Sequence, residues 1–331
     1  MFSISKVYVF VVILFLLPVH SNANDKYCLV DKLERLDIYS SYWLNMHHFL
    51  YQTADKSSLY KFNTWKIDST IINQLPETDR TILNNTLDYY SDNMIMRHLL
   101  FSDTMYAIKN WLITLPCDEN LPDTFFVDGF TEILNSFDPV YRKYFWETHN
   151  KINTDRWNKQ SEIIKSIEPA LIDEISKYAK KDFPDRIRVD LTAYSNSLGG
   201  YTTEVPPHVI LSSDYIYTQG TQWIELIFHE ASHTIMSTEG EINKELVRIS
   251  AELDKKLPGQ YWHAIQFYLV GRIVQKILAS KGIEHEIFMF ENDVFTRYLK
   301  KYFTNNLDLY LDGSLTLEKA LKNIIKETDF H

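Results

Sequence analysis

Apolar side chains recur at helical spacing along the first 180 residues of this chain. Over residues 29–55 they fall near a period of 3.6, and similar stripes recur in 95–114, 125–147 and 155–180. Only 9 of the 331 residues are glycine, which is few for a chain rich in turns. The pattern therefore predicts a mainly helical N-terminal part.

The period of the pattern changes after residue 185. Ile187, Val189 and Leu191 alternate with polar residues, which predicts a half-buried strand. The next segment, NSLGGYTTEVPP over 196–207, is rich in turn-forming residues and predicts a loop. The sequence HVILSS, which begins at His208, predicts a second strand.

Helical patterns dominate again from residue 221 onward. We expect helices over 221–237, 241–257 and 260–278, where glycine and proline residues mark the ends of the apolar stripes. A last helix is expected to begin after Thr316, whose hydroxyl suits an N-cap position. The local order is thus strand, glycine-rich loop, strand and helices.

The N-terminus has the features of a secretory signal peptide. Lys6 precedes an apolar run, Val7 to Val19, which is too short to cross a bilayer and is followed by small residues. We expect cleavage after Ala23, no stable membrane insertion afterwards, and a secreted or periplasmic mature protein. A signal anchor that is never cleaved is the alternative.

The mature chain is long enough for one large domain, and a hydrophobic content of 45% is ample for a packed core. No linker rich in proline or glycine divides it. We therefore expect a signal peptide over 1–23 and one mainly α (α+β) domain over 24–331. Its parts are a helical region (24–185), a region of two strands and a helix (186–240), and a second helical region (241–331).

Charge and cysteine content narrow the possible functions. The formal net charge of −10 argues against binding nucleic acid through charge. Cys28 and Cys117 are predicted to form a disulfide bond, as suits an exported protein, with two buried free thiols as the alternative. No nucleophile elbow, phosphate-binding loop or dinucleotide-binding fingerprint occurs.

The segment IELIFHEASHTIM, residues 224–236, carries the candidate chemistry. On a helix, His229 and His233 lie one above the other and can both bind one zinc ion. Glu230 projects beside them and can act as the general base for a zinc-activated water. Burying these three residues in an apolar helix without partners is costly, so the context also favours a metal ion.

The HEASH motif, preceded by strand, loop and strand, resembles the active-site helix of zincin metallopeptidases. The layout GGYTTEVPPHVILSS, IELIFHEASH and YWHAIQFYLVG is similar to that of a poorly characterised family of secreted bacterial HExxH proteins. The resemblance covers roughly residues 186–280. It implies a zincin-like core in which one strand of a small sheet holds an extended substrate across the cleft.

A catalytic zinc ion needs a third protein ligand, and the sequence offers two candidates. His263 lies in an apolar row with Phe267, where a polar group needs a partner, and the resemblance also expects a ligand in this stretch. Glu252 follows His233 at the spacing found in one large aminopeptidase family of zincins, but it belongs to a polar helix face. A core histidine bonded to a carbonyl is the alternative for His263.

Three further residues are assigned supporting roles. Glu225, one turn before His229, is predicted to accept a hydrogen bond from a ligand histidine, with a surface acid as the alternative. Gly200 and Tyr201 are predicted to bind substrate, Tyr201 by donating to the developing oxyanion. Packing is the alternative role for the tyrosine.

These observations predict a secreted zinc metallopeptidase with one zinc ion per chain, acting on a peptide or protein substrate. Two alternatives stay open. One is an inactive zincin-like binding or scaffold protein that keeps a structural metal, and the other is a zinc hydrolase that acts on a non-peptide amide.

Overall fold

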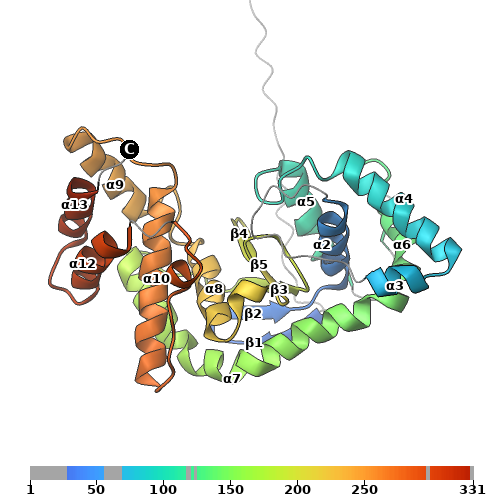
Figure 1. Cartoon of the computed structure of the whole chain (residues 1–331), viewed down its shortest axis with the longest axis horizontal. Helices are drawn as coiled ribbons and strands as arrows, with labels where there is room; N and C mark the ends of the chain where they lie inside the picture. The colour runs from blue at the N-terminus through green and yellow to red at the C-terminus, as the bar shows by residue number, and fades with distance from the viewer. Residues whose placement is uncertain (1–27, 56–68, 117–120, 123–124, 296–298, 329–331) are drawn as a thin grey trace, which may run out of the picture.

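The computed structural model describes residues 28–55, 69–116, 121–122, 125–295 and 299–328. The predicted signal peptide, its cleavage after Ala23 and the disulfide partner Cys117 lie outside the described residues. The predicted fold class is confirmed, because the chain is mainly helical with a small mixed sheet (Figure 1). None of the described helices is long and apolar enough to cross a membrane.

The sheet has five strands in the order β1-β2-β3-β5-β4. The strands are β1 (Leu29–Lys32), β2 (Leu36–Tyr39), β3 (Ile187–Thr192), β4 (Gly200–Glu204) and β5 (Pro207–Ser212). The three central strands β2, β3 and β5 run parallel, whereas β1 and β4 are antiparallel to their neighbours. Strand β4 therefore forms one edge of the sheet.

The first two strands replace the start of the helix predicted over 29–55. Leu36 and Ile38 are fully buried, while Asp37 between them forms an ion pair with Arg186, the residue just before β3. A four-residue strand is too short to show a clear period, so spacing alone favoured a helix. Pairing with β3 decides the conformation.

The glycine-rich segment is a strand as well as a loop. Residues 200–204 pair with β5, with Thr202 opposite Val209. Gly199 has a φ of 90°, and a Cβ there would lie 2.7 Å from the Tyr215 ring. Glycine therefore permits the tight entry into β4, and the prediction of a pure loop was wrong.

Helices from the N-terminal region cover one face of the sheet (Figure 1). Tyr201 and Ile210, which point to this face, belong to the same buried cluster as side chains of these helices. The helices are α2 (Tyr42–Ala54), α3 (Ser69–Gln74), α4 (Glu77–Asn93), α5 (Asp103–Leu112) and α6 (Phe130–Tyr144).

The opposite face packs against the long helix α7 (Trp146–Ala179), α8 (Thr221–Ser232) and α10 (Tyr261–Ser280), in one cluster with Val189 and Leu211. The remaining elements are η1 (Ile216–Thr218), α9 (Glu241–Glu252), α11 (Phe288–Glu291), α12 (Leu299–Leu311) and α13 (Leu317–Glu327). The sheet thus separates two apolar cores.

The later helix predictions hold, α10 with nearly the predicted bounds and α8 and α9 with shorter ones. Helix α8 ends at Ser232 and continues as turns to residue 237, and α9 ends at Glu252 rather than 257. Thr316 caps α13 as expected, because its hydroxyl accepts a hydrogen bond from the backbone N of Lys319 at 3.2 Å. In the N-terminal region, the stripe over 95–114 forms a helix only from Asp103 to Leu112.

Strand β3 is buried on both faces rather than on one. Asp190 and Thr192, predicted to face solvent, are fully buried because α2 covers them. The Asp190 carboxylate accepts hydrogen bonds from Arg188, Ser41 and His208, the last at 2.8 Å. Partners supplied by the neighbouring strand and helix make this burial possible.

Candidate metal centre

Helix α8 carries the HExxH motif into the core. The chain enters the helix through Gly220, whose φ is 57°, and Trp223 and Ile227 anchor it fully buried against the sheet. His229 lies on the helix and His233 at its C-cap, so the two imidazoles are one turn apart. Their ring centroids are 4.9 Å apart, so the two rings lie next to each other on one side of the helix.

His263, in the first turn of α10, completes a group of three imidazoles. One nitrogen from each of His229, His233 and His263 lies within 4.8 Å of the others. The Nε2 atoms of His229 and His263 are 3.1 Å apart. In a tetrahedral zinc site with Zn–N distances of about 2.0–2.1 Å, ligand atoms are about 3.3 Å apart, so the spacing of His229 and His263 fits a shared metal ion, and a small shift would bring in His233.

The environment keeps these imidazoles neutral. Burial lowers the pKa of His233 to about 3 and that of His263 to about 4, and it holds the pKa of His229 well below its usual range. A metal ion binds the neutral form of imidazole. Among the described residues, no carboxylate pairs with the three rings, so a cation is the partner that this arrangement suits.

Glu252, the other candidate ligand, lies elsewhere. Its side chain is 42% exposed and forms ion pairs with Arg248 and Lys322, the latter at 3.4 Å. The polar face of α9 therefore points it toward solvent, as helix periodicity indicated. The structure brings His263, and not Glu252, to the motif histidines.

Glu230 lies beside the imidazoles with its carboxylate held by β4. The Thr202 hydroxyl lies 2.7 Å from Glu230 Oε2 and 2.8 Å from the Glu230 carbonyl oxygen. Burial raises the pKa of Glu230 to about 7, although the Thr202 hydrogen bond lowers it. A Cβ at Gly200 would lie 3.2 Å from Glu230 Cγ, so Gly200 allows the strand to approach the glutamate closely.

Tyr201 points away from this site. Neighbouring residues of a strand face opposite sides, and Thr202 faces Glu230. The Tyr201 hydroxyl instead lies 3.0 Å from His48 Nε2, and the ring packs in the N-terminal core. The structure therefore gives Tyr201 a packing role and does not bring it to the predicted oxyanion position.

Glu225 is fully buried, which excludes the reading as a surface acid. Its Oε2 accepts hydrogen bonds from His285 Nε2 at 2.6 Å and from the backbone N of Phe288 at 2.8 Å. The expected hydrogen bond from a ligand histidine is not present, because His229 Nδ1 has no partner among the described residues. Glu225 joins α8 to the segment before α11 instead.

Three residues near the site were not found from the sequence. Thr202 holds Glu230, His285 pairs with Glu225, and the Trp262 ring lies 5.9 Å from the His233 ring and 5.3 Å from the His263 ring. Had residues 200–204 been predicted as a strand, alternation would have placed Thr202 and Tyr201 on opposite faces of the sheet. His285 lies in an irregular segment that carries no periodic signal.

A second buried polar group lies on the other face of the sheet. Besides Asp190 and its partners, it contains Lys109, which is 1% exposed and donates to the Thr203 hydroxyl. Burial lowers the pKa of Lys109 to about 7. Burial alone raises the pKa of Asp190, but Arg188 and His208 outweigh it and hold this pKa well below its usual range.

No protein-family model matches the chain, and no curated protein and no solved structure matches it significantly. Its function must therefore be argued from the geometry of the site.

Proposed function

We propose that this chain is an exported zinc metallopeptidase, with His229, His233 and His263 as the zinc ligands and Glu230 as the general base. The observation that carries the proposal is the convergence of three neutral imidazoles within 4.8 Å, next to a buried glutamate that follows the first ligand. A catalytic zinc site has three protein ligands and one open position, and this group supplies three. That count favours catalysis over a closed structural site.

The chain's own residues divide the chemistry between them. Zinc, when bound, supplies the Lewis acidity that lowers the pKa of a water molecule toward about 7. Thr202 fixes Oε2 of Glu230, which leaves Oε1 to take a proton from the attacking water and deliver it to the leaving amine. The buried position of Glu230 limits access of other water to this transfer.

Edge strand β4 supports a peptide as the substrate. Among the described strands it pairs only with β5, so the sheet itself leaves the backbone groups of its other edge for an added strand. Thr202 of the same strand contacts Glu230, so a peptide paired with this edge passes beside the general base. The extended backbone of a peptide, rather than a small amide, suits such an edge.

The test is to replace Glu230 by glutamine. The amide cannot accept the proton, so Glu230→Gln should lower kcat on a peptide library by at least about a thousandfold. Zinc content, measured by mass spectrometry, should stay at one ion per chain, and the far-UV circular dichroism spectrum should not change. Glu252→Gln, at an exposed position, is the matched control and should keep full activity.

Two results would contradict the proposal. One is a wild-type protein that binds no zinc when zinc is supplied. The other is equal turnover by wild type and Glu230→Gln. A zinc-loaded protein that fails to bind a hydroxamate would instead support the scaffold reading, because a hydroxamate needs the open position.

A further inference from the structure

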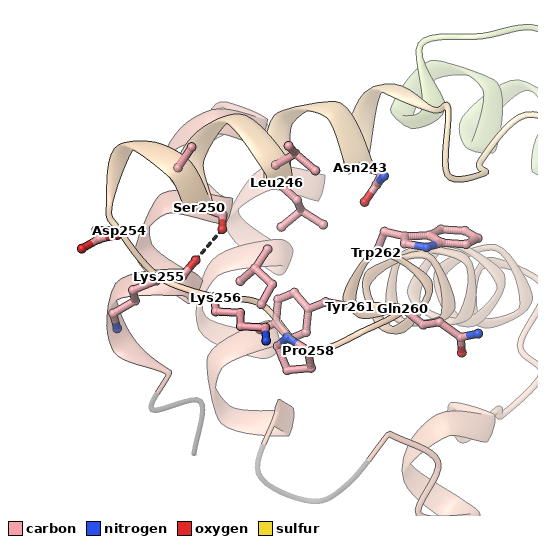
Figure 2. A pocket seen from close by; sticks show the side chains of 13 residues that line it. Asn243, Leu246, Ser250, Asp254, Lys255, Lys256, Pro258, Gln260, Tyr261 and Trp262 are labelled. Carbon is pink, nitrogen blue, oxygen red and sulfur yellow. Dashed lines mark hydrogen bonds between the residues drawn. The ribbon is translucent and has the colours of Figure 1, made fainter.

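A pocket lies next to the three imidazoles, between α9 and the start of α10 (Figure 2). Its volume is about 590 Å³, within the range of roughly 300–1,000 Å³ that is typical of ligand pockets. One wall is a face of α9, where residues 243, 246, 247, 250 and 251 follow helical spacing, and Asp254 just after the helix extends it. The other wall is the segment 255–262, which leads directly into His263.

Trp262 connects this pocket with the candidate metal centre. Its side chain lines the pocket, and its ring lies edge-on to His233 and 5.3 Å from His263, measured between ring centroids. One residue of the pocket wall is therefore also in contact with two of the three imidazoles.

Several polar groups of the wall already have partners inside the protein. Asn243 donates to the Thr238 carbonyl at 2.7 Å, and Ser250 donates to the Lys255 carbonyl, as the dashed line in Figure 2 shows. Lys255 Nζ donates to the carbonyls of Ile325, Lys326 and Thr328. Asp254, Lys256 and Gln260, which are exposed, also line the pocket, so polar groups remain available at its open side.

The surface that remains is mainly apolar. Val247 is 61% exposed although it is aliphatic, and Leu257, Pro258 and Trp262 line the pocket with it. Burying such a surface is favourable by about 25 cal/mol per Å², and only an apolar group gains this energy without losing hydrogen bonds to water. The chemistry of the walls therefore selects a bulky apolar side chain.

We infer that this pocket is a specificity pocket, which binds one large apolar side chain, preferably aromatic, of the peptide substrate. The inference rests on the proposed function for the identity of the ligand. Side chains on one side of an extended peptide repeat about every 6.7 Å. Since Trp262 lies between the imidazoles and the pocket, the selected residue is not the one at the cleaved bond but a neighbour along the peptide.

The first arm of the test measures cleavage. Wild-type protein should prefer phenylalanine, tyrosine or tryptophan over alanine at one position of a peptide library. Val247→Asp places a charge on the apolar wall and should reduce the ratio of kcat/KM for the aromatic peptide to that for its alanine counterpart by about tenfold or more. Leu309→Asp, at an exposed aliphatic residue of α12, is the matched control and should leave the ratio unchanged.

The second arm measures binding without cleavage. Zinc-loaded Glu230→Gln protein should bind a fluorescent ten-residue peptide that contains phenylalanine about tenfold more tightly than the alanine version, by fluorescence anisotropy. Adding Val247→Asp should remove this difference, whereas adding Leu309→Asp should keep it. The arm does not depend on turnover.

The outcomes separate the two proposals. Cleavage without an aromatic preference, or a preference that survives Val247→Asp in both arms, overturns the specificity pocket and leaves the peptidase proposal standing. No cleavage by wild type, combined with aromatic-selective binding that Val247→Asp removes, overturns the peptidase proposal and supports the pocket as a peptide-binding site. Equal binding of both peptides overturns the pocket whatever the activity.

Discussion

The two faces of the sheet both bury histidines, but they satisfy them in different ways. On the face covered by α2, His208 donates to Asp190, and His48 contacts the Leu44 carbonyl and the Tyr201 hydroxyl. On the face covered by α8, His229, His233 and His263 contact one another. The first group pairs with a carboxylate, a carbonyl and a hydroxyl, and only His208 Nδ1 has no partner among the described residues, whereas the second brings three ring nitrogens together. The difference indicates which face could hold an external cation.

The two faces of the sheet also differ in how their charged groups are compensated. The α2 face holds the ionised pair of Asp190 and Arg188, so its charges are compensated internally. The α8 face holds imidazoles whose pKa values burial lowers, beside Glu230, whose pKa burial raises. We therefore expect substitutions on the α2 face to change the free energy of unfolding without affecting metal binding. Metal removal should change the free energy of unfolding through the α8 face.

Metal removal should have the largest effect. If free zinc is at about a thousand times its dissociation constant, chelation should lower the free energy of unfolding by about 4 kcal/mol. Denaturation with and without a chelator measures the difference. His263→Ala should remove it, whereas Glu252→Ala should keep it, because Glu252 pairs with Arg248 and Lys322. A loss of the difference in Glu252→Ala alone would reassign the third ligand.

Asp190→Asn should have the next largest effect. The change leaves Arg188, which is only partly exposed, without its carboxylate partner and weakens the bond to fully buried His208, so the free energy of unfolding should fall by about 3 kcal/mol. Urea denaturation measures this change. Zinc content should remain at one ion per chain, and its loss would contradict the independence of the two faces. Asp185→Asn, in an exposed ion pair with Arg35, should cost less than about 0.5 kcal/mol.

A smaller, pH-dependent effect is expected for Lys109. Its folded pKa of about 7 lies below its usual value of 10.5, so the folded chain releases a proton at about pH 7 that the unfolded chain keeps. Lys109 therefore destabilises the fold most below pH 7, and this cost declines as the pH rises toward 10.5. Lys109→Met should be more stable than wild type by about 1–2 kcal/mol at pH 6.5.

The measurement is the difference in free energy of unfolding between Lys109→Met and wild type from pH 6.5 to 9.5. This difference should shrink with rising pH. Lys244→Met, at an exposed lysine, is the control and should show no such trend. A constant difference for Lys109→Met would show that its ammonium group is not desolvated in the folded state.

Sequence patterns predicted the fold class, β3, β5 and the helices around the motif, because these segments are long enough to show a period. Helical spacing also brought His229 and His233 together, and the position of His263 in an apolar row marked it as a residue in need of a partner. The same reasoning kept Glu252 on a polar face, where the structure has it.

The misses have local causes. Strands β1 and β2 have four residues each; β2 pairs with a segment about 150 positions away, and β1 pairs with β2. The partner of Glu225 could not be predicted, because His285 comes from an irregular segment that tertiary packing brings to α8. Burial of Asp190 depends on α2 covering the sheet, and the sequence of residues 187–192 alone does not show that a helix covers this strand.

The parallel pairing of β2 with β3 has a consequence for how the protein is made. The chain leaves the sheet after Tyr39 and returns at Ile187, so the helices between them form an excursion from a continuous sheet. During synthesis, β2 cannot pair with β3 until nearly 190 residues have been joined. Strand β5 and helix α8 are made only after that. Helix α8 therefore packs onto a sheet that is completed late, and neither half of the chain contains the whole sheet that supports it.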